Sequence, residues 1–269
     1  MSSTISFEVT DHVGTVMLNR PDRNNAWTGR METEYRQALA EAEKDDDVRV
    51  IVICGAGDRF CVGADGRALG GMTKSGTYDS GVREPLVEPG RGDDPDLAGR
   101  HSFLWGIDKP VIAAVHGAAA GVGLAIASFA DLRFVAHGTK LTTAGAKIGM
   151  PAEFGLSWLL PRMVGSGVAA DLLLTSRVFG AEEALSIGWA NRLLDREGFR
   201  QAAVGEAAAI AAACAPSSLR AIKRQIVDDL RGRFADAEAT YHRLVDEMVG
   251  SADFNEGVAA MNERRPPKF

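Results

Sequence analysis

Apolar and polar positions in the first half of the chain alternate between the period of strands and the period of helices. Residues 13–18 form a short run with β-branched side chains, and residues 48–53 are almost wholly apolar, as expected for a strand covered on both faces. Between these runs, apolar residues from Met31 to Ala42 recur every three or four positions, which is the spacing of an amphipathic helix. This alternation predicts an α/β core.

The alternation continues to about residue 198 and then stops. We expect further strands at 110–115, 132–136 and 193–194, and further helices at 121–130, 156–164, 168–174 and 182–187. After them come only helical patterns, at 199–214, from Pro216 onward, at 234–249 and at 253–262. The prediction is therefore a core at residues 1–198 followed by a helical region at residues 199–269.

The segment 70–100 interrupts the core with a composition rich in Gly, Asp and Pro. Irregular segments of this length are uncommon inside a compact domain, and they are either mobile functional loops or solvated insertions. The sequence leaves both alternatives open.

Composition and charge exclude several classes of function. The 269 residues are 46% hydrophobic and 25% charged, as in typical globular proteins, and the net charge of −6 disfavours a nucleic-acid-binding face. No run of 18 apolar residues indicates a membrane span, and the polar N-terminus does not resemble a signal peptide. The three cysteines form no CxxC pair, so we expect reduced thiols and a cytoplasmic location.

Familiar cofactor and nucleophile motifs are absent from the sequence. It contains no GxGxxG dinucleotide fingerprint, no GxxxxGK[ST] phosphate loop and no GxSxG nucleophile turn. The five histidines form no HxxxH or HExxH pair, so we expect no metal site.

Two glycine-rich loops carry the candidate chemistry. Residues 55–66 follow the apolar strand at 48–53, and residues 116–123 follow the strand at 110–115. Each loop ends where a helix is expected to begin, and free N–H groups at a helix start bind negative charge. Two converging loops of this kind place two backbone donors on one oxygen, as in an oxyanion hole. The alternative is that these glycines only allow close packing of helix on sheet.

Several segments of the chain, in a fixed order, carry a likeness to a known family. They are LNRPDRNNA (18–26), VRVIVICGAGDRFCVGAD (48–65), KPVIAAVHGAAAGVG (109–123), ADLRFVA (130–136), LPRMVG (160–165), EEALSIGWAN (182–191) and DFNEGVAAMNERRPPKF (253–269). Over nearly its full length the chain resembles the enoyl-CoA hydratase/isomerase (crotonase) superfamily. The resemblance implies an α/β fold, with a crotonase-like ββα spiral core and a C-terminal α-helical trimerisation part. It also implies an acyl-CoA thioester substrate, no cofactor beyond the coenzyme A of that substrate, and a homotrimer or a hexamer of paired trimers.

The resemblance further implies which residues act. Two backbone N–H groups of the family polarise the thioester carbonyl, and their positions here are Ala64 and Val122. Because both donors are main-chain groups, Val122 can replace the glycine that the family usually has there. Contacts to coenzyme A are implied at Arg23, Ala26, Val62, Asp65, Gly121 and Arg264. The aromatic residue of the family's last helix is Met261 here, and we interpret His116 and Asp131 as structural.

The acid/base residues are where this sequence departs from the family pattern. The positions of the two glutamates of typical hydratases are Ala125 and Gly145 here, and neither side chain can transfer a proton. Glu153 instead stands eight residues before Pro161, where some Δ3,Δ2-enoyl-CoA isomerases of the family carry their single acid. The alternative role for Glu153 is to stabilise the helix expected after it through the helix dipole.

Three hypotheses follow from these residues. The first is a Δ3,Δ2-enoyl-CoA isomerase that uses Glu153 as its one acid/base, with a pKa raised by apolar neighbours such as Phe154 and Trp158. The second is an enoyl-CoA hydratase of fatty-acid β-oxidation, in which Glu153 alone activates the water. The third is a non-catalytic acyl-CoA-binding protein of the same fold, because both hydratase acids are missing.

Overall fold

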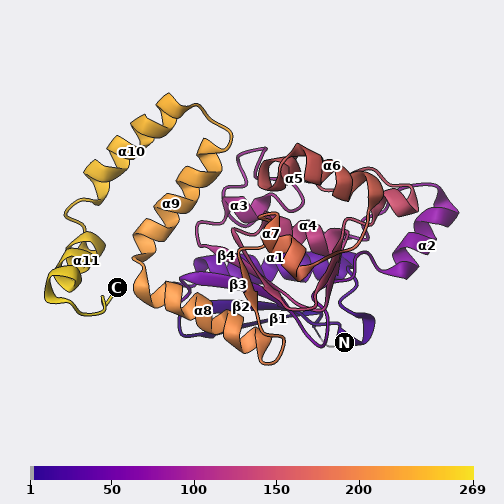
Figure 1. The fold of residues 1–269 in the computed structure, drawn as a ribbon, viewed down its shortest axis with the longest axis horizontal. Coiled ribbons are helices and arrows are strands. Elements are labelled where there is room, and N and C mark those ends of the chain that lie inside the picture. Colours follow the sequence, from indigo (N-terminus) through magenta and orange to yellow (C-terminus); the bar gives the residue numbers. More distant parts are fainter. Residues whose placement is uncertain (1–2) are drawn as a thin grey trace.

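The computed structural model describes residues 3–269, and its centre is a six-stranded sheet (Figure 1). In spatial order the strands are β1 (Ile5–Thr10), β2 (Val13–Leu18), β3 (Val50–Gly55), β4 (Val111–Val115), β6 (Leu132–Ala136) and β9 (Arg192–Leu194). β1 pairs antiparallel with β2, and the other neighbouring pairs are parallel. The parallel strands therefore end at one common edge, where the two glycine-rich loops follow β3 and β4.

The central strands β3 and β4 are buried on both faces of the sheet, and alternate residues of a strand belong to opposite faces. Three helices cover the faces: α1 (Gly29–Lys44), α4 (Val122–Phe129) and α8 (Phe199–Ala213). Val50 and Val52 pack with α8, whereas Ile51 and Ile53 belong to the cluster with α1 and α4. The buried stripe of α8 consists of Phe199 and of small residues four apart: Ala203, Ala207 and Ala211. A strand covered on both faces is apolar at every position, which explains the pattern of β3.

A smaller layer completes the core beside the glycine-rich loops. Its three-stranded sheet consists of β5 (Ala118–Ala120), β7 (Lys140–Thr142) and β8 (Phe179–Gly180). The other elements of the core are η1 (Pro21–Arg23), α2 (Gly66–Ser75), α3 (Phe103–Gly106), η2 (Gly145–Ile148), α5 (Leu156–Val164), α6 (Ser166–Thr175) and α7 (Ala181–Ser186). In Figure 1, α2 projects from the core on the side opposite to the C-terminal helices.

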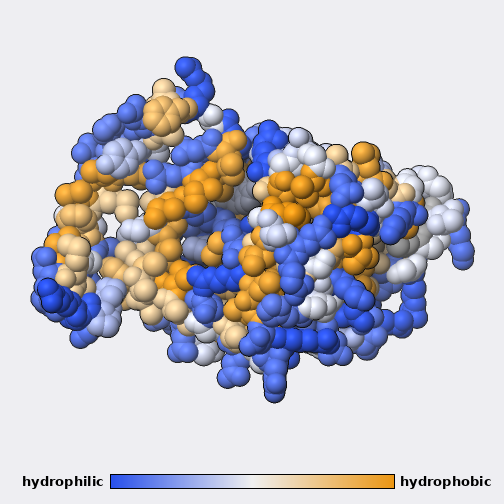
Figure 2. All heavy atoms as spheres, in the orientation of Figure 1, coloured by the Kyte–Doolittle hydropathy of each residue, from blue (hydrophilic) through white to orange (hydrophobic). Residues whose placement is uncertain are grey.

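Three helices extend from the sheet at the C-terminal end of the chain: α9 (Pro216–Asp229), α10 (Phe234–Met248) and α11 (Ala252–Glu263) (Figure 1). They leave large apolar side chains exposed, such as Ile226 at 57% and Phe234 at 82%. Figure 2 shows apolar side chains along α9, beside the hollow between these helices and the core. An apolar groove of about 330 Å³ lies between α9 and the core.

A buried cation fixes α9 to the core. Lys223 is 5% exposed, and its Nζ donates to the carbonyl oxygens of Leu104 at 2.9 Å and Lys109 at 3.0 Å. The same ammonium pairs with Asp131 Oδ2 at 2.7 Å, and that oxygen also accepts the backbone N–H of Val111 at 2.7 Å. Asp131 therefore has the structural role that the sequence suggested, because it joins the start of β4 to α9.

The predicted order of an α/β core followed by helices is confirmed. Every strand and helix predicted between residues 13 and 262 occurs, with its ends shifted by a few residues. One expectation is corrected, because the segment 70–100 begins inside α2 and is not irregular throughout. β1, β5, β7 and β8 were not expected, since β1 is a largely exposed edge strand and the others are too short to show a period. The division of the chain at residue 198 stays a prediction.

Three further features of residues 3–269 bear on function. No single helix there has the length and apolar character needed to cross a membrane; α8 and α9 satisfy both criteria only together, and the chain bends by 107° between them. This part of the chain contains no group of three or more His, Cys, Asp or Glu residues that could hold a metal ion. The cysteines are free thiols, and burial raises the pKa of Cys54 and Cys61 to about 12.

We expect Lys223→Met to lower the free energy of unfolding by about 3 kcal/mol, because it leaves the Asp131 carboxylate and two carbonyl groups without their cation. Urea denaturation followed by circular dichroism measures the change. Lys147→Met, at an exposed lysine, is the matched control and should change the free energy by less than about 0.5 kcal/mol. Equal stabilities of the two variants would show that this contact does not hold α9 in place.

Candidate active site

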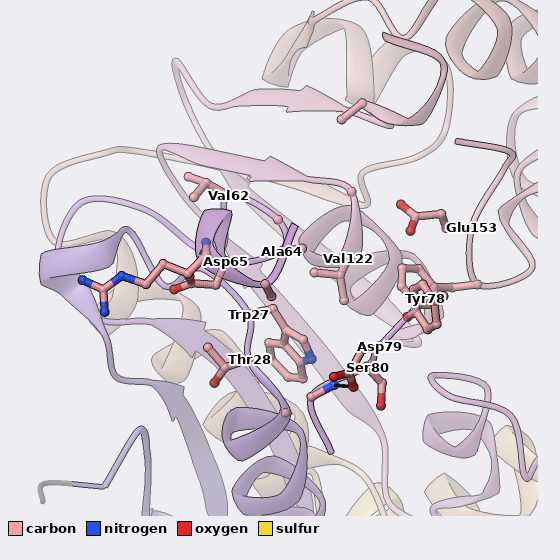
Figure 3. Close-up of a pocket in the computed structure, with 18 of the residues that line it drawn as sticks. Trp27, Thr28, Val62, Ala64, Asp65, Tyr78, Asp79, Ser80, Val122 and Glu153 are labelled. Atoms are coloured by element: carbon pink, nitrogen blue, oxygen red, sulfur yellow. Dashed lines mark hydrogen bonds between the residues drawn. The ribbon is translucent and has the colours of Figure 1, made fainter. Parts of the chain in front are cut away.

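A cavity of about 620 Å³ opens where the two glycine-rich loops meet (Figure 3). Ala64, Val122 and Glu153 line it together, although they come from three separate segments of the chain. Arginines lie along part of its wall: Arg20, Arg23, Arg30 and Arg67. Aromatic and aliphatic side chains form another part: Trp27, Tyr78, Ile148, Met150 and Phe154. The cavity therefore suits a ligand with a negatively charged part and an apolar part.

The first loop leaves the backbone N–H of Ala64 free. Trp27 forms a parallel bridge with Ala64, in which Trp27 N donates to Gly63 O at 2.8 Å and Trp27 O accepts from Asp65 N at 2.9 Å. In a parallel bridge the residue between the two bonded neighbours directs its own N–H to the other side. Gly63 has a φ of 106°, which favours glycine. Within residues 3–269, the Ala64 amide donates no hydrogen bond, so it is available to a ligand.

The second loop leaves the backbone N–H of Val122 free. Val122 is the first residue of α4, and Gly121 before it has φ 49° and ψ −117° and provides no side-chain cap. The Gly121 amide donates to Thr142 O at 3.2 Å, whereas the Val122 amide has no acceptor in the described part of the chain. As the first amide of a helix, Val122 N–H also carries the positive end of the helix dipole.

Backbone contacts hold the two loops against each other. Cys61 N donates to Ala118 O at 3.2 Å, and Ala120 N donates to Cys61 O at 3.0 Å. A Cβ at Gly123 would lie 2.3 Å from Cys61 O, so only glycine fits at this contact. The loops are joined further by a hydrogen bond in which His116 Nε2 donates to the Gly57 carbonyl oxygen at 2.9 Å. The glycines thus permit tight packing, and this packing is what places both free amides at one cavity.

Glu153 approaches the two amides from the segment before α5. Its carboxylate points toward Val122 in Figure 3, and Oε2 lies 3.9 Å from the position that a Cβ on Gly121 would occupy. Half-burial beside apolar side chains raises the pKa of Glu153, and the positive charge of Arg100 opposes that effect. The raised pKa agrees in direction with the expectation from the sequence.

Glu153 differs from the other acids that line the cavity among the described residues, which are Asp65 and Asp79. The pKa of Asp65 is lowered: burial opposes this, but the Arg67 amide at 3.0 Å and the Arg20 guanidinium at 3.1 Å stabilise the carboxylate. The Arg83 guanidinium lowers the pKa of Asp79 to about 2. A base that is always paired accepts a proton poorly, so Glu153 is the one carboxylate here that is suited to proton transfer.

The two positions without hydratase acids are enclosed by protein. Ala125 is 0% exposed on α4 and belongs to the hydrophobic core. Gly145 is buried in η2, where a Cβ would lie 3.0 Å from Pro151 O and 3.3 Å from Met150 O. Neither residue lines the cavity.

The predicted coenzyme A contacts fall into two groups. Arg23, Val62, Asp65 and Gly121 line the cavity. Ala26 does not line it, and its carbonyl oxygen accepts the Arg20 guanidinium behind the wall. Arg264 ends α11 at a φ of 55° and lies outside this cavity, as does Met261. The contacts of all six predicted residues to coenzyme A stay predictions.

Sequence reasoning did not find a buried charge network behind the cavity. Glu32 is fully buried, and its carboxylate accepts the Trp27 Nε1–H at 3.0 Å and the Arg36 Nε–H at 3.1 Å. Arg100 lies 3.4 Å from the same carboxylate and donates to the Tyr78 hydroxyl at 2.9 Å. The sequence signal for this network was the opposite charges of Glu32 and Arg36, which stand four residues apart beside the apolar stripe of α1.

We expect Gly123→Ala to lower the free energy of unfolding by about 2–3 kcal/mol, because its methyl group would collide with the Cys61 carbonyl that joins the loops. The measurement is urea denaturation at neutral pH. Gly205→Ala is the control, since it adds the same methyl group to an exposed position of α8 and meets nothing within 4 Å. If Gly123→Ala were as stable as this control, the close approach of the loops would not be a constraint.

Comparisons with known proteins agree with this geometry. A family model described as Enoyl-CoA hydratase/isomerase matches residues 8–269. The chain is 35% identical to the probable enoyl-CoA hydratase EchA12 of Mycobacterium tuberculosis (strain ATCC 25618 / H37Rv), over 99% of this chain and 94% of that protein. It is 30% identical to the 1,2-epoxyphenylacetyl-CoA isomerase of Escherichia coli (strain K12), over 100% of this chain and 99% of that protein.

A solved structure extends the likeness to the fold. The crystal structure of a probable enoyl-CoA hydratase/isomerase from Mycobacterium abscessus has a TM-score of 0.85 and 31% identity, and the match covers 98% of each chain. The predicted α/β crotonase fold with C-terminal helices is confirmed, and the family implies an acyl-CoA substrate. The chain belongs to the enoyl-CoA hydratase/isomerase (crotonase) superfamily.

Proposed function

We propose that this protein is a Δ3,Δ2-enoyl-CoA isomerase with Glu153 as its only acid/base. One observation carries the proposal: a single carboxylate with a raised pKa lies beside two free backbone amides, while the hydratase positions are Ala125 and Gly145. A double-bond shift needs one group that removes and returns a proton, whereas hydration also needs a group that activates water. The presence of one such carboxylate supports the first reaction.

The proposed reaction begins when the amides of Ala64 and Val122 donate hydrogen bonds to the thioester oxygen. The Glu153 carboxylate takes a proton from C2, and the electrons of the C2–H bond move toward that oxygen, which gives a dienolate. The thioester carbonyl then re-forms, the C1=C2 electrons of the dienolate become the C2=C3 double bond, and the electrons of the C3=C4 bond, which is lost, take the proton from Glu153 at C4. Each amide strengthens its hydrogen bond as charge develops, and the loss of one such donor costs about 3–4 kcal/mol of barrier.

The remaining parts of the cavity have matching roles in this proposal. The arginines of the wall, Arg23 among them, attract the phosphates of coenzyme A, and Asp65 holds its loop through Arg20. The apolar part that surrounds Glu153 receives the acyl chain and excludes water from the dienolate.

We expect Glu153→Gln to lower kcat for a 3-enoyl-CoA by at least about 100-fold, because the amide cannot take the C2 proton. Conversion to the 2-enoyl thioester, followed by its ultraviolet absorbance, measures this. In the wild type, kcat/KM should fall as the pH drops through the raised pKa of Glu153, because only the carboxylate form is a base. Undiminished isomerisation by Glu153→Gln would overturn the assignment of Glu153.

The stability of the same variant is a control for folding. A raised pKa means that the folded state holds the proton more tightly than the unfolded state, so Glu153 costs stability once the pH exceeds that pKa. Glu153→Gln removes the charge, and its melting temperature at pH 8 should be no lower than that of the wild type.

The other hypotheses have distinct readouts: a hydratase adds water to a 2-enoyl-CoA, and an inert homologue binds acyl-CoA without turnover.

We also propose that the exposed apolar side chains of α9–α11 are covered by neighbouring subunits in a trimer or a paired trimer. Monomeric proteins rarely leave large apolar patches in water, and Ile226, Phe234 and Met261 are each more than half exposed in the single chain. Sedimentation equilibrium should give three or six times the 28.6 kDa of one chain. Ile226→Asp with Phe234→Asp should shift the mass toward one chain, and a monomeric wild type would contradict the proposal.

A further inference from the structure

A second cavity lies behind the segment that carries Glu153. It has a volume of about 350 Å³, and its wall shares Arg100 and Phe154 with the first cavity. Glu153 lines the first cavity only, and Gly155 lines the second only. The chain therefore passes between the two cavities at residues 153–155, and the side chains of Phe154 and Arg100 separate them.

The separating side chains are held in place by several contacts. The Phe154 ring packs edge-on against His101, with 4.8 Å between ring centres, and Arg100 Cζ lies 6.0 Å from the centre of the same ring. Arg100 is itself fixed by the Tyr78 hydroxyl and by Glu32. Phe154 has a φ of 54°, which is unusual for a large side chain and persists only where the surroundings impose it. These contacts keep the ring between the cavities.

One part of the wall of the second cavity is aromatic, and the rest includes Asp96, Arg100 and Arg231. Trp105 packs against Phe129 at 5.1 Å and against Trp158 at 5.9 Å between ring centres, and all three line the cavity. His101 also lines it and is 1% exposed, with no hydrogen-bond partner on either ring nitrogen in the described part of the chain. Burial lowers the pKa of His101 to about 4, so the imidazole is neutral at physiological pH. The aromatic part of the wall, which includes the neutral His101 ring, suits an apolar chain.

We propose that Phe154, held by Arg100, is the residue that limits acyl-chain length: the wild type binds acyl groups that end at the Phe154 ring, and the aromatic cavity behind it accepts a longer apolar tail once the ring is removed. This inference rests on the proposed function only in taking acyl-CoA as the ligand. It assigns the end of the acyl pocket to one side chain next to the acid/base residue.

The test compares the dissociation constants of hexanoyl-CoA and dodecanoyl-CoA by isothermal titration calorimetry. These saturated thioesters cannot isomerise, so binding is measured independently of catalysis. Burial of one methylene group tightens binding about fourfold. We therefore expect Phe154→Ala to raise the ratio of dodecanoyl-CoA affinity to hexanoyl-CoA affinity at least about tenfold over that of the wild type. Phe154→Leu, which retains most of the side chain and its packing, should give an intermediate ratio.

Trp158→Ala is the matched control, because Trp158 lines the second cavity and not the first. It enlarges the rear space while the Phe154 ring stays in place, so the affinity ratio should equal that of the wild type. An unchanged ratio in Phe154→Ala, or an equal rise in Trp158→Ala, would overturn the inference. Failure of the wild type to bind either thioester would instead contradict the proposed function.

Discussion

The site depends on the close approach of two backbones at the carboxyl edge of the sheet. Cys61 exchanges hydrogen bonds with the strand β5, and the lack of a side chain at Gly123 allows α4 to begin directly against it. Because Trp27 pairs with the neighbours of Ala64, and because Val122 is the first residue of a helix, one amide on each loop has no acceptor among residues 3–269. Both amides lie at the cavity, where a single thioester oxygen would accept a hydrogen bond from each.

The carboxylates in and around the cavity differ in whether they have a charged partner. Glu32, Asp65 and Asp79 each have an arginine partner, and those pairs hold the walls of the cavity in place. Glu153 has no ion pair within residues 3–269, and its partial burial raises its pKa, whereas the pKa values of Asp65 and Asp79 are lowered. The carboxyl groups of Glu32, Asp65 and Asp79 thus have structural roles, whereas the carboxyl group of Glu153 is the proton acceptor in the proposed reaction.

Much of the fold was predictable, because strands such as β3 and β4 are buried on both faces and are therefore apolar throughout. The continuation of α2 into the segment 70–100 was not, since its Gly-rich residues have a low intrinsic preference for helix. The donors and Glu153 were predictable only through family motifs, because a backbone amide has no sequence signal of its own. Arg100 lies in an irregular stretch, and its position beside Phe154 comes from tertiary contacts that no local pattern encodes.

The proposed use of main-chain donors has a consequence for how the sequence can vary. At Ala64 and Val122 the group that would act is common to every residue except proline, so many substitutions there leave it in place. At Gly123 and Gly117, which have no functional group at all, a single added methyl group meets a carbonyl oxygen of the facing loop. Within these two loops, substitution is therefore tolerated less at Gly117 and Gly123, which take no part in the proposed chemistry, than at the two positions whose amides would act.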